Sequence, residues 1–70
     1  MSIKQYVGAS IKKRRKELKM NQDTLQDYAE VGPTTLSTTE NGKANLTLDV
    51  LEKILNPLGL EIVIQVKSIK

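Results

Sequence analysis

The stretch from Asn21 to Lys43 constrains the fold more than any other, because it predicts two short helices joined by a tight turn. Asn21 is a suitable N-cap for the first helix, since its side-chain oxygen can accept from free amides of the opening turn. Pro33 fits the first position of the second helix, with Gly32 as its N-cap. Residues predicted to face inward recur at helical spacing in both: Leu25, Tyr28, Ala29, Leu36 and Thr39.

Two short helices with a turn of about three to four residues form a helix-turn-helix. A longer helix precedes this motif and runs to about Lys19. It begins with a predicted capping box of Ser2 and Gln5. Gly8 inside it predicts close packing against another helix, and Arg15 falls on its apolar stripe, where a lone charge would need a partner. The predicted inward residues are Ile3, Val7, Ile11 and Leu18.

A further helix follows the motif, with Thr47 as its N-cap and a stop near Pro57 and Gly59. Its apolar face is wider than one small core requires. From Leu60 to Lys67 the pattern changes to strict alternation, which predicts a β-strand. One face of this strand carries Leu60, Ile62, Ile64 and Val66.

A single strand has unpaired edges and no sheet on which to bury its apolar face. We therefore expect it to pair with a second copy of the chain across a two-fold axis. This divides the chain into residues 1–59, a helical domain, and residues 60–70, a dimerisation tail. A chain of 70 residues forms one domain that is marginally stable alone, which also favours self-association.

The charge distribution favours an anionic partner. Residues 1–19 contain seven Lys and Arg against Glu17 alone, a net +6, whereas residues 20–70 contain four against seven acids, a net −3. The sequence has no cysteine or histidine, and no apolar run of the ~20 residues that a membrane span needs. No catalytic constellation is present. We expect a cytoplasmic, non-enzymatic protein without metal or cofactor.

The helix-turn-helix region resembles the phage-repressor (Xre/Cro-like) family, through Gln22, Leu25, Val31, Leu36, Glu40, Gly42 and Lys43. The resemblance implies a mainly α, lambda-repressor-like bundle of four to five helices, here with one C-terminal β-strand that pairs across a dimer. Three residues depart from the family pattern. Gln26 stands where the family usually has alanine, Glu30 where it has glycine, and Thr39 where it has an aliphatic residue.

The resemblance also implies a double-stranded DNA partner and assigns roles to single residues. Arg15 and Glu40 would form a structural ion pair. The residues facing base edges would be Pro33, Thr34, Ser37 and Thr38, and those contacting phosphates would be Gln22, Thr35, Asn41 and Lys43. A threonine hydroxyl and methyl can both contact base edges, but without the bidentate reach of Arg or Asn.

The tail narrows the resemblance to the HipB-like antitoxins, whose C-terminal strands form a ribbon between subunits. This implies a homodimeric transcriptional repressor on an inverted-repeat operator, with a HipA-like kinase toxin as a further partner. A protein-interaction module that no longer binds DNA is the alternative. It is favoured by the net negative charge of residues 20–70 and by the absence of Lys and Arg from Pro33 to Glu40.

Overall fold

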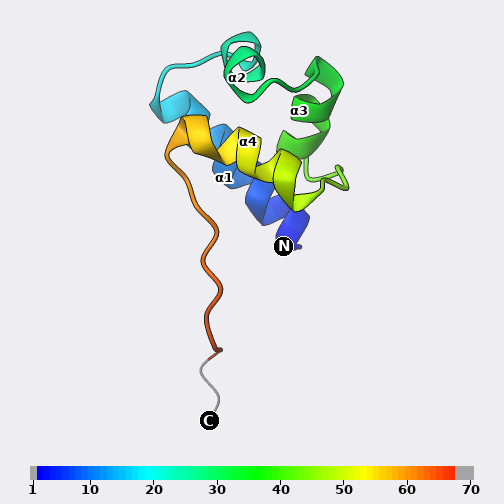
Figure 1. Ribbon diagram of the computed structural model, residues 1–70, viewed down its shortest axis with the longest axis vertical. Helices are drawn as coiled ribbons and strands as arrows, with labels where there is room; N and C mark the ends of the chain where they lie inside the picture. Colours follow the sequence, from blue (N-terminus) through cyan, green and yellow to red (C-terminus); the bar gives the residue numbers. More distant parts are fainter. Residues whose placement is uncertain (1, 68–70) are drawn as a thin grey trace.

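The computed structural model describes residues 2–67, in which four helices gather into one bundle (Figure 1). They are α1 (Ile3–Glu17), α2 (Gln22–Ala29), α3 (Pro33–Glu40) and α4 (Leu48–Leu58). The remaining described residues leave the end of α4 as an extended tail that points away from the bundle. The predicted helical fold with a central helix-turn-helix is confirmed.

The helix starts follow the predicted caps. Ser2 and Gln5 form the capping box, with hydrogen bonds of 2.9 and 3.2 Å between each side chain and the other residue's amide. The Oδ1 atom of Asn21 accepts from the amide of Thr24 at 2.8 Å, and Thr47 caps α4 in the same way. Pro33 occupies the first turn of α3, where its missing amide costs no hydrogen bond.

The core lies where α1, α2, α3 and α4 meet, and consists of Ile11, Leu25, Ala29, Leu36, Ile54, Leu55 and Leu58. Three residues predicted to face inward do not. Ile3 is 83% exposed, Tyr28 65% and Leu18 38%. Ile3 lies in the first turn of α1 and Leu18 beyond its last, whereas the buried stripe of α2 is narrow and passes through residues four apart, Leu25 and Ala29.

Gly8 lies where α1 crosses α3, and the predicted close packing is confirmed. A Cβ atom added there would collide with the carbonyl oxygen of Thr39 and would lie 2.9 Å from that of Glu40. Thr39 itself is buried and satisfies its hydroxyl by donating to the carbonyl of Thr35 at 2.6 Å. The crossing therefore fixes α3 against α1 through backbone contact.

In the turn between α2 and α3, Glu30 adopts a backbone conformation that glycine would favour. Glu30 has φ 57° and ψ 43°, the left-handed conformation, and its amide donates to the carbonyl of Gln26. A residue with a side chain is strained by roughly 1–2 kcal/mol in this conformation. The departure from glycine therefore costs stability but leaves the turn in place.

The C-terminal end of α4 is tied to α1. Pro57 lies in the last turn of α4, which ends one residue later at Leu58, and Gly59 follows with φ 68°. The Nε atom of Arg14 donates to the carbonyl oxygen of Leu58 at 2.9 Å. Arg14 thus satisfies a carbonyl that the helix end would leave without a partner.

The predicted strand is absent as a strand in the described chain, since residues 60–67 form neither helix nor strand. A β-strand is defined by its hydrogen bonds to a neighbouring strand. Within residues 2–67 of a single chain there is no second strand with which residues 60–67 pair. Leu60 is half-buried beside the core, whereas Ile62 is 54% exposed and both Ile64 and Val66 are 93% exposed. The rest of the predicted tail, residues 68–70, lies outside the described residues.

Candidate nucleic-acid interface

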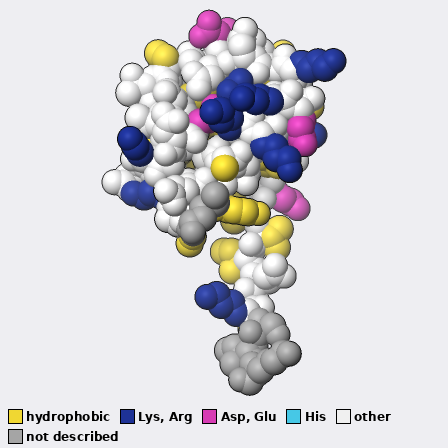
Figure 2. All heavy atoms as spheres, turned by 180° about the vertical axis from the view of Figure 1, so that it is seen from behind, with side chains coloured by type: hydrophobic (Ala, Val, Ile, Leu, Met, Phe, Trp, Pro, Cys, Tyr) yellow, Lys and Arg dark blue, Asp and Glu magenta, His cyan; other side chains and the backbone are white. Residues whose placement is uncertain are grey.

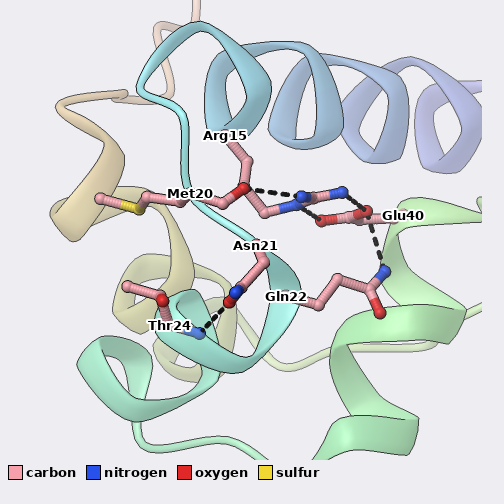
Figure 3. Close-up of polar contacts among 6 residues, drawn as sticks. All are labelled: Arg15, Met20, Asn21, Gln22, Thr24 and Glu40. Carbon is pink, nitrogen blue, oxygen red and sulfur yellow. Dashed lines mark hydrogen bonds and ion pairs between the residues drawn. The ribbon is translucent and has the colours of Figure 1, made fainter.

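A buried ion pair connects α1 to the end of α3 (Figure 3). The guanidinium of Arg15 donates twice to the carboxylate of Glu40, from Nε to Oε2 at 2.7 Å and from Nη2 to Oε1 at 3.0 Å. The side chains are only 9% and 2% exposed. A third donor of Arg15, Nη1, reaches the carbonyl of Met20 at 2.9 Å, so the pair also holds the segment that leads into α2.

Gln22 joins this network from the first turn of α2. Its Nε2 atom donates to Oε1 of Glu40 at 3.1 Å, so the carboxylate at the end of α3 is contacted from both α1 and α2 (Figure 3). Within residues 2–67 no other hydrogen bond to the Gln22 side chain is formed, and the amide nitrogen carries a second hydrogen. The start of α2 also presents free backbone amides, a favourable place for an anion.

The electrostatics keep the pair ionised. Burial raises the pKa of Glu40, but hydrogen bonds from Arg15 and Gln22 and the positive charges of Arg15 and Lys12 outweigh it, so the pKa lies below its ordinary value. The hydrogen bond to Glu40 raises the pKa of Arg15. The exposed Lys12 of α1 therefore acts on this network through its charge.

The outer surface of α3 presents small side chains. Pro33 and Thr34 are exposed, and Thr35, Ser37 and Thr38 are half-buried. Thr38 donates its hydroxyl hydrogen to the carbonyl of Thr34 at 2.8 Å, with that of Thr35 at 3.1 Å. With its hydrogen donated in this way, the Thr38 oxygen can serve a further partner only as an acceptor. No hydrogen bond within residues 2–67 involves the hydroxyls of Thr34 and Ser37.

The segment after α3 carries the other two predicted contacts. Asn41 is the C-cap of α3, and its backbone amide donates to the carbonyl of Ser37 at 3.1 Å. The backbone amide of Lys43 donates to the carbonyl of Thr38 at 2.9 Å. Both side chains are exposed. Between them Gly42 has φ 73°, and an added Cβ would lie 2.9 Å from Cα of Gln5. This loop is therefore pressed against the first turns of α1.

The positive charge of the molecule comes from outside α3, which has no Lys or Arg. Figure 2 shows Lys and Arg side chains across one face of the bundle, and hydrophobic side chains along the tail. Among the described residues there is no cluster of potential metal ligands, and no helix is long and apolar enough to cross a membrane.

Comparison with protein families matches residues 11–64 to a helix-turn-helix family, which covers all of α2, α3 and α4 and residues 11–17 of α1. A search of curated proteins finds no match to the chain. The match includes the ion pair, the turn at Glu30 and the exposed face of α3. The chain belongs to the Xre/Cro-like helix-turn-helix family, a family of DNA-binding domains.

Proposed function

We propose that this protein is a transcriptional repressor that binds a specific inverted-repeat DNA site as a homodimer. The observation that carries the proposal is the rigid mounting of α3. Its end is held by Arg15 and Gln22 through Glu40, and its body by the backbone contact at Gly8. A helix fixed at this precision with small hydroxyl side chains on its open face suits insertion into a major groove.

The proposed residue roles are those that the family resemblance implies, and the exposure of these side chains supports them. Base edges would be contacted by the open face of α3, that is by Pro33, Thr34, Ser37 and Thr38. The backbone would be contacted from both sides of that face, by Gln22 at the start of α2, by Thr35 on α3, and by Asn41 and Lys43 in the following loop. Phosphate contacts of this kind set the register of the protein on DNA but carry little sequence information.

The dimer would form through the tail, with residues 1–59 as the DNA-binding domain. Two open hollows flank the base of the tail, with volumes of about 480 and 540 Å³. Their apolar walls include Leu48, Leu55 and Tyr6. With Leu60, Ile62, Ile64 and Val66 these walls form an exposed apolar surface that a second copy could cover.

A salt titration of duplex binding tests the proposal. If Lys12 and Lys43 each neutralise one phosphate per protomer, a dimer releases about four counterions, and log K should fall with log salt with a slope of about −4. An inverted repeat should bind more tightly than a random duplex of equal length. A flat slope, together with equal weak binding to every duplex, would overturn the proposal.

Two observations favour the alternative of a protein-interaction module. The helix α3 itself carries no positive charge, and the two most exposed of the large apolar side chains, Ile64 and Val66, lie on the tail. The same titration separates the two functions, because a module without DNA contacts gives the flat slope. The narrower role of an antitoxin for a HipA-like kinase rests on the resemblance of the tail. A kinase encoded by the adjacent gene, and its co-purification with this protein, would support that role.

A further inference from the structure

The described part of the tail carries a negative charge near its start, at Glu61, and a positive charge at its end, at Lys67. Glu61 and Lys67 lie six residues apart, and Ile64 is equidistant from both. Both charged residues are exposed and belong to the same alternating set, which is the opposite set from Ile62, Ile64 and Val66. The backbone between them is free of secondary structure in the single chain, so all of its hydrogen-bonding groups are open to a partner strand.

Antiparallel pairing about Ile64 satisfies both charge and apolar pattern. With the two-fold axis at Ile64, each Glu61 lies opposite Lys67 of the other copy, twice per dimer. On the other face, Ile62 lies opposite Val66 and Ile64 opposite its own copy. Opposite charges directly across a strand pair are stabilising, whereas parallel in-register pairing would place Glu61 against Glu61 and Lys67 against Lys67.

The neighbouring registers lose one of these features. A shift that places the axis at Val63 leaves Glu61 opposite Gln65, and one that places it at Gln65 leaves Lys67 opposite Val63. An axis that lies between two residues places each residue of the apolar set opposite one of the polar set. Both faces of the ribbon would then mix apolar and polar side chains. Among these arrangements, the axis at Ile64 is the one that keeps the apolar face continuous and pairs both charges.

We infer that the subunits pair through an antiparallel two-stranded ribbon whose two-fold axis passes through Ile64, with two Glu61–Lys67 pairs that set its register. This inference rests on the proposed dimer and specifies its partner surface. The register also brings Val66 of the other copy beside Ile62, at the rim of both hollows. The apolar side chains at the open end of each tail are thereby placed against the base of the other.

Cysteine cross-linking measures the register, and the natural chain contains no cysteine to interfere. Across an antiparallel pair, directly opposed Cα atoms lie about 4.5–5.5 Å apart, within the range that a disulfide spans. I64C should therefore form a disulfide-linked dimer under mild oxidation. The matched variants V63C and Q65C should not, because their own copies are displaced by two residues along each strand, about 7 Å.

A charge exchange tests the pairs themselves. E61K alone and K67E alone should each weaken the homodimer about 10-fold, because both pairs per dimer become repulsive. An equimolar mixture of the two variants should recover wild-type affinity, since each heterodimer contains only opposite pairs. Size exclusion and sedimentation equilibrium of the separate and mixed variants give the readout.

The outcomes separate this inference from the proposed function. Efficient cross-linking at V63C or Q65C in place of I64C, or no recovery in the mixture, overturns the register while a dimeric wild-type protein keeps the proposed repressor intact. A wild-type protein that sediments as a monomer overturns the dimer and the register together. Specific, salt-dependent DNA binding by such a monomer would retain the DNA-binding part alone.

Discussion

Replacing Glu40 with alanine should be among the most damaging single changes in this domain. The substitution removes both acceptors of Arg15 at 2.7 and 3.0 Å and the acceptor of Gln22 at 3.1 Å. Arg15 would keep its bond to the carbonyl of Met20 but would remain charged in a site where its side chain is 9% exposed. Breaking one side of a buried pair typically costs 3–5 kcal/mol, and we expect about 3 kcal/mol here.

Urea denaturation followed by circular dichroism gives the free energy of unfolding of the wild type and variants. E17A is the matched control, since the Arg14–Glu17 pair is long, at 3.5 Å, with both side chains about half exposed. It should cost less than about 0.5 kcal/mol. Because a domain of this size has a stability of only about 4–10 kcal/mol, E40Q provides a milder variant that keeps the shape and one acceptor.

The apolar double variant R15M/E40M extends the test. Replacing both partners leaves no unpaired charge, so it should be more stable than E40A. A loss below about half a kcal/mol for E40A, equal to that of E17A, would refute the reasoning by showing that the pair is solvated.

Four further predictions have defined outcomes. Because folding lowers the pKa of Glu40, the contribution of its carboxylate to the free energy of unfolding is present above the unfolded pKa of about 4.3 and is lost as the pH falls below that value. Unfolding measured across acid pH should show this loss of stability, and the loss should be smaller in E40Q. Gly8→Ala should lower the melting temperature despite a helix propensity gain of ~1 kcal/mol, because its methyl group meets a backbone carbonyl of α3. Glu30→Gly should stabilise the protein by about 1 kcal/mol in the same denaturation assay, by removing the left-handed strain. In gel-shift competition, Thr34→Ala should reduce the ratio of operator to random-duplex affinity, whereas Lys43→Ala should weaken both equally.

The helices and their caps could be predicted from the sequence because the signals are local. Ser2, Asn21, Pro33 and Thr47 each act within one turn of their own position. Burial was predicted less well, and the errors at Ile3, Leu18 and Tyr28 have one cause. Periodicity gives the direction of a side chain around a helix axis, but not how far along that axis the neighbouring helices extend.

Part of the polar network was also beyond the reach of the sequence. A charge on the apolar stripe of α1 indicates that Arg15 needs a partner, and the family resemblance suggests Glu40. Nothing local indicates that Gln22 shares the same carboxylate, or that Arg14 contacts the carbonyl of Leu58, 44 residues away. The lone tail could be predicted to be extended, while its pairing depends on a second molecule.

The contact between Arg14 and Leu58 has a consequence for operator geometry. It anchors the residue from which the tail departs to α1, and α1 is locked to α3 at Gly8. In the proposed dimer, α3 of each subunit is therefore held at a fixed position relative to the symmetry axis. No long flexible linker lies between them that could adjust the distance between the two copies of α3. One extra base pair between half-sites shifts them by about 3.4 Å and rotates them by roughly 35°. Two α3 helices at a fixed separation cannot adjust to that displacement. The protein would therefore discriminate between operators by the length of the spacer as well as by the bases that α3 contacts.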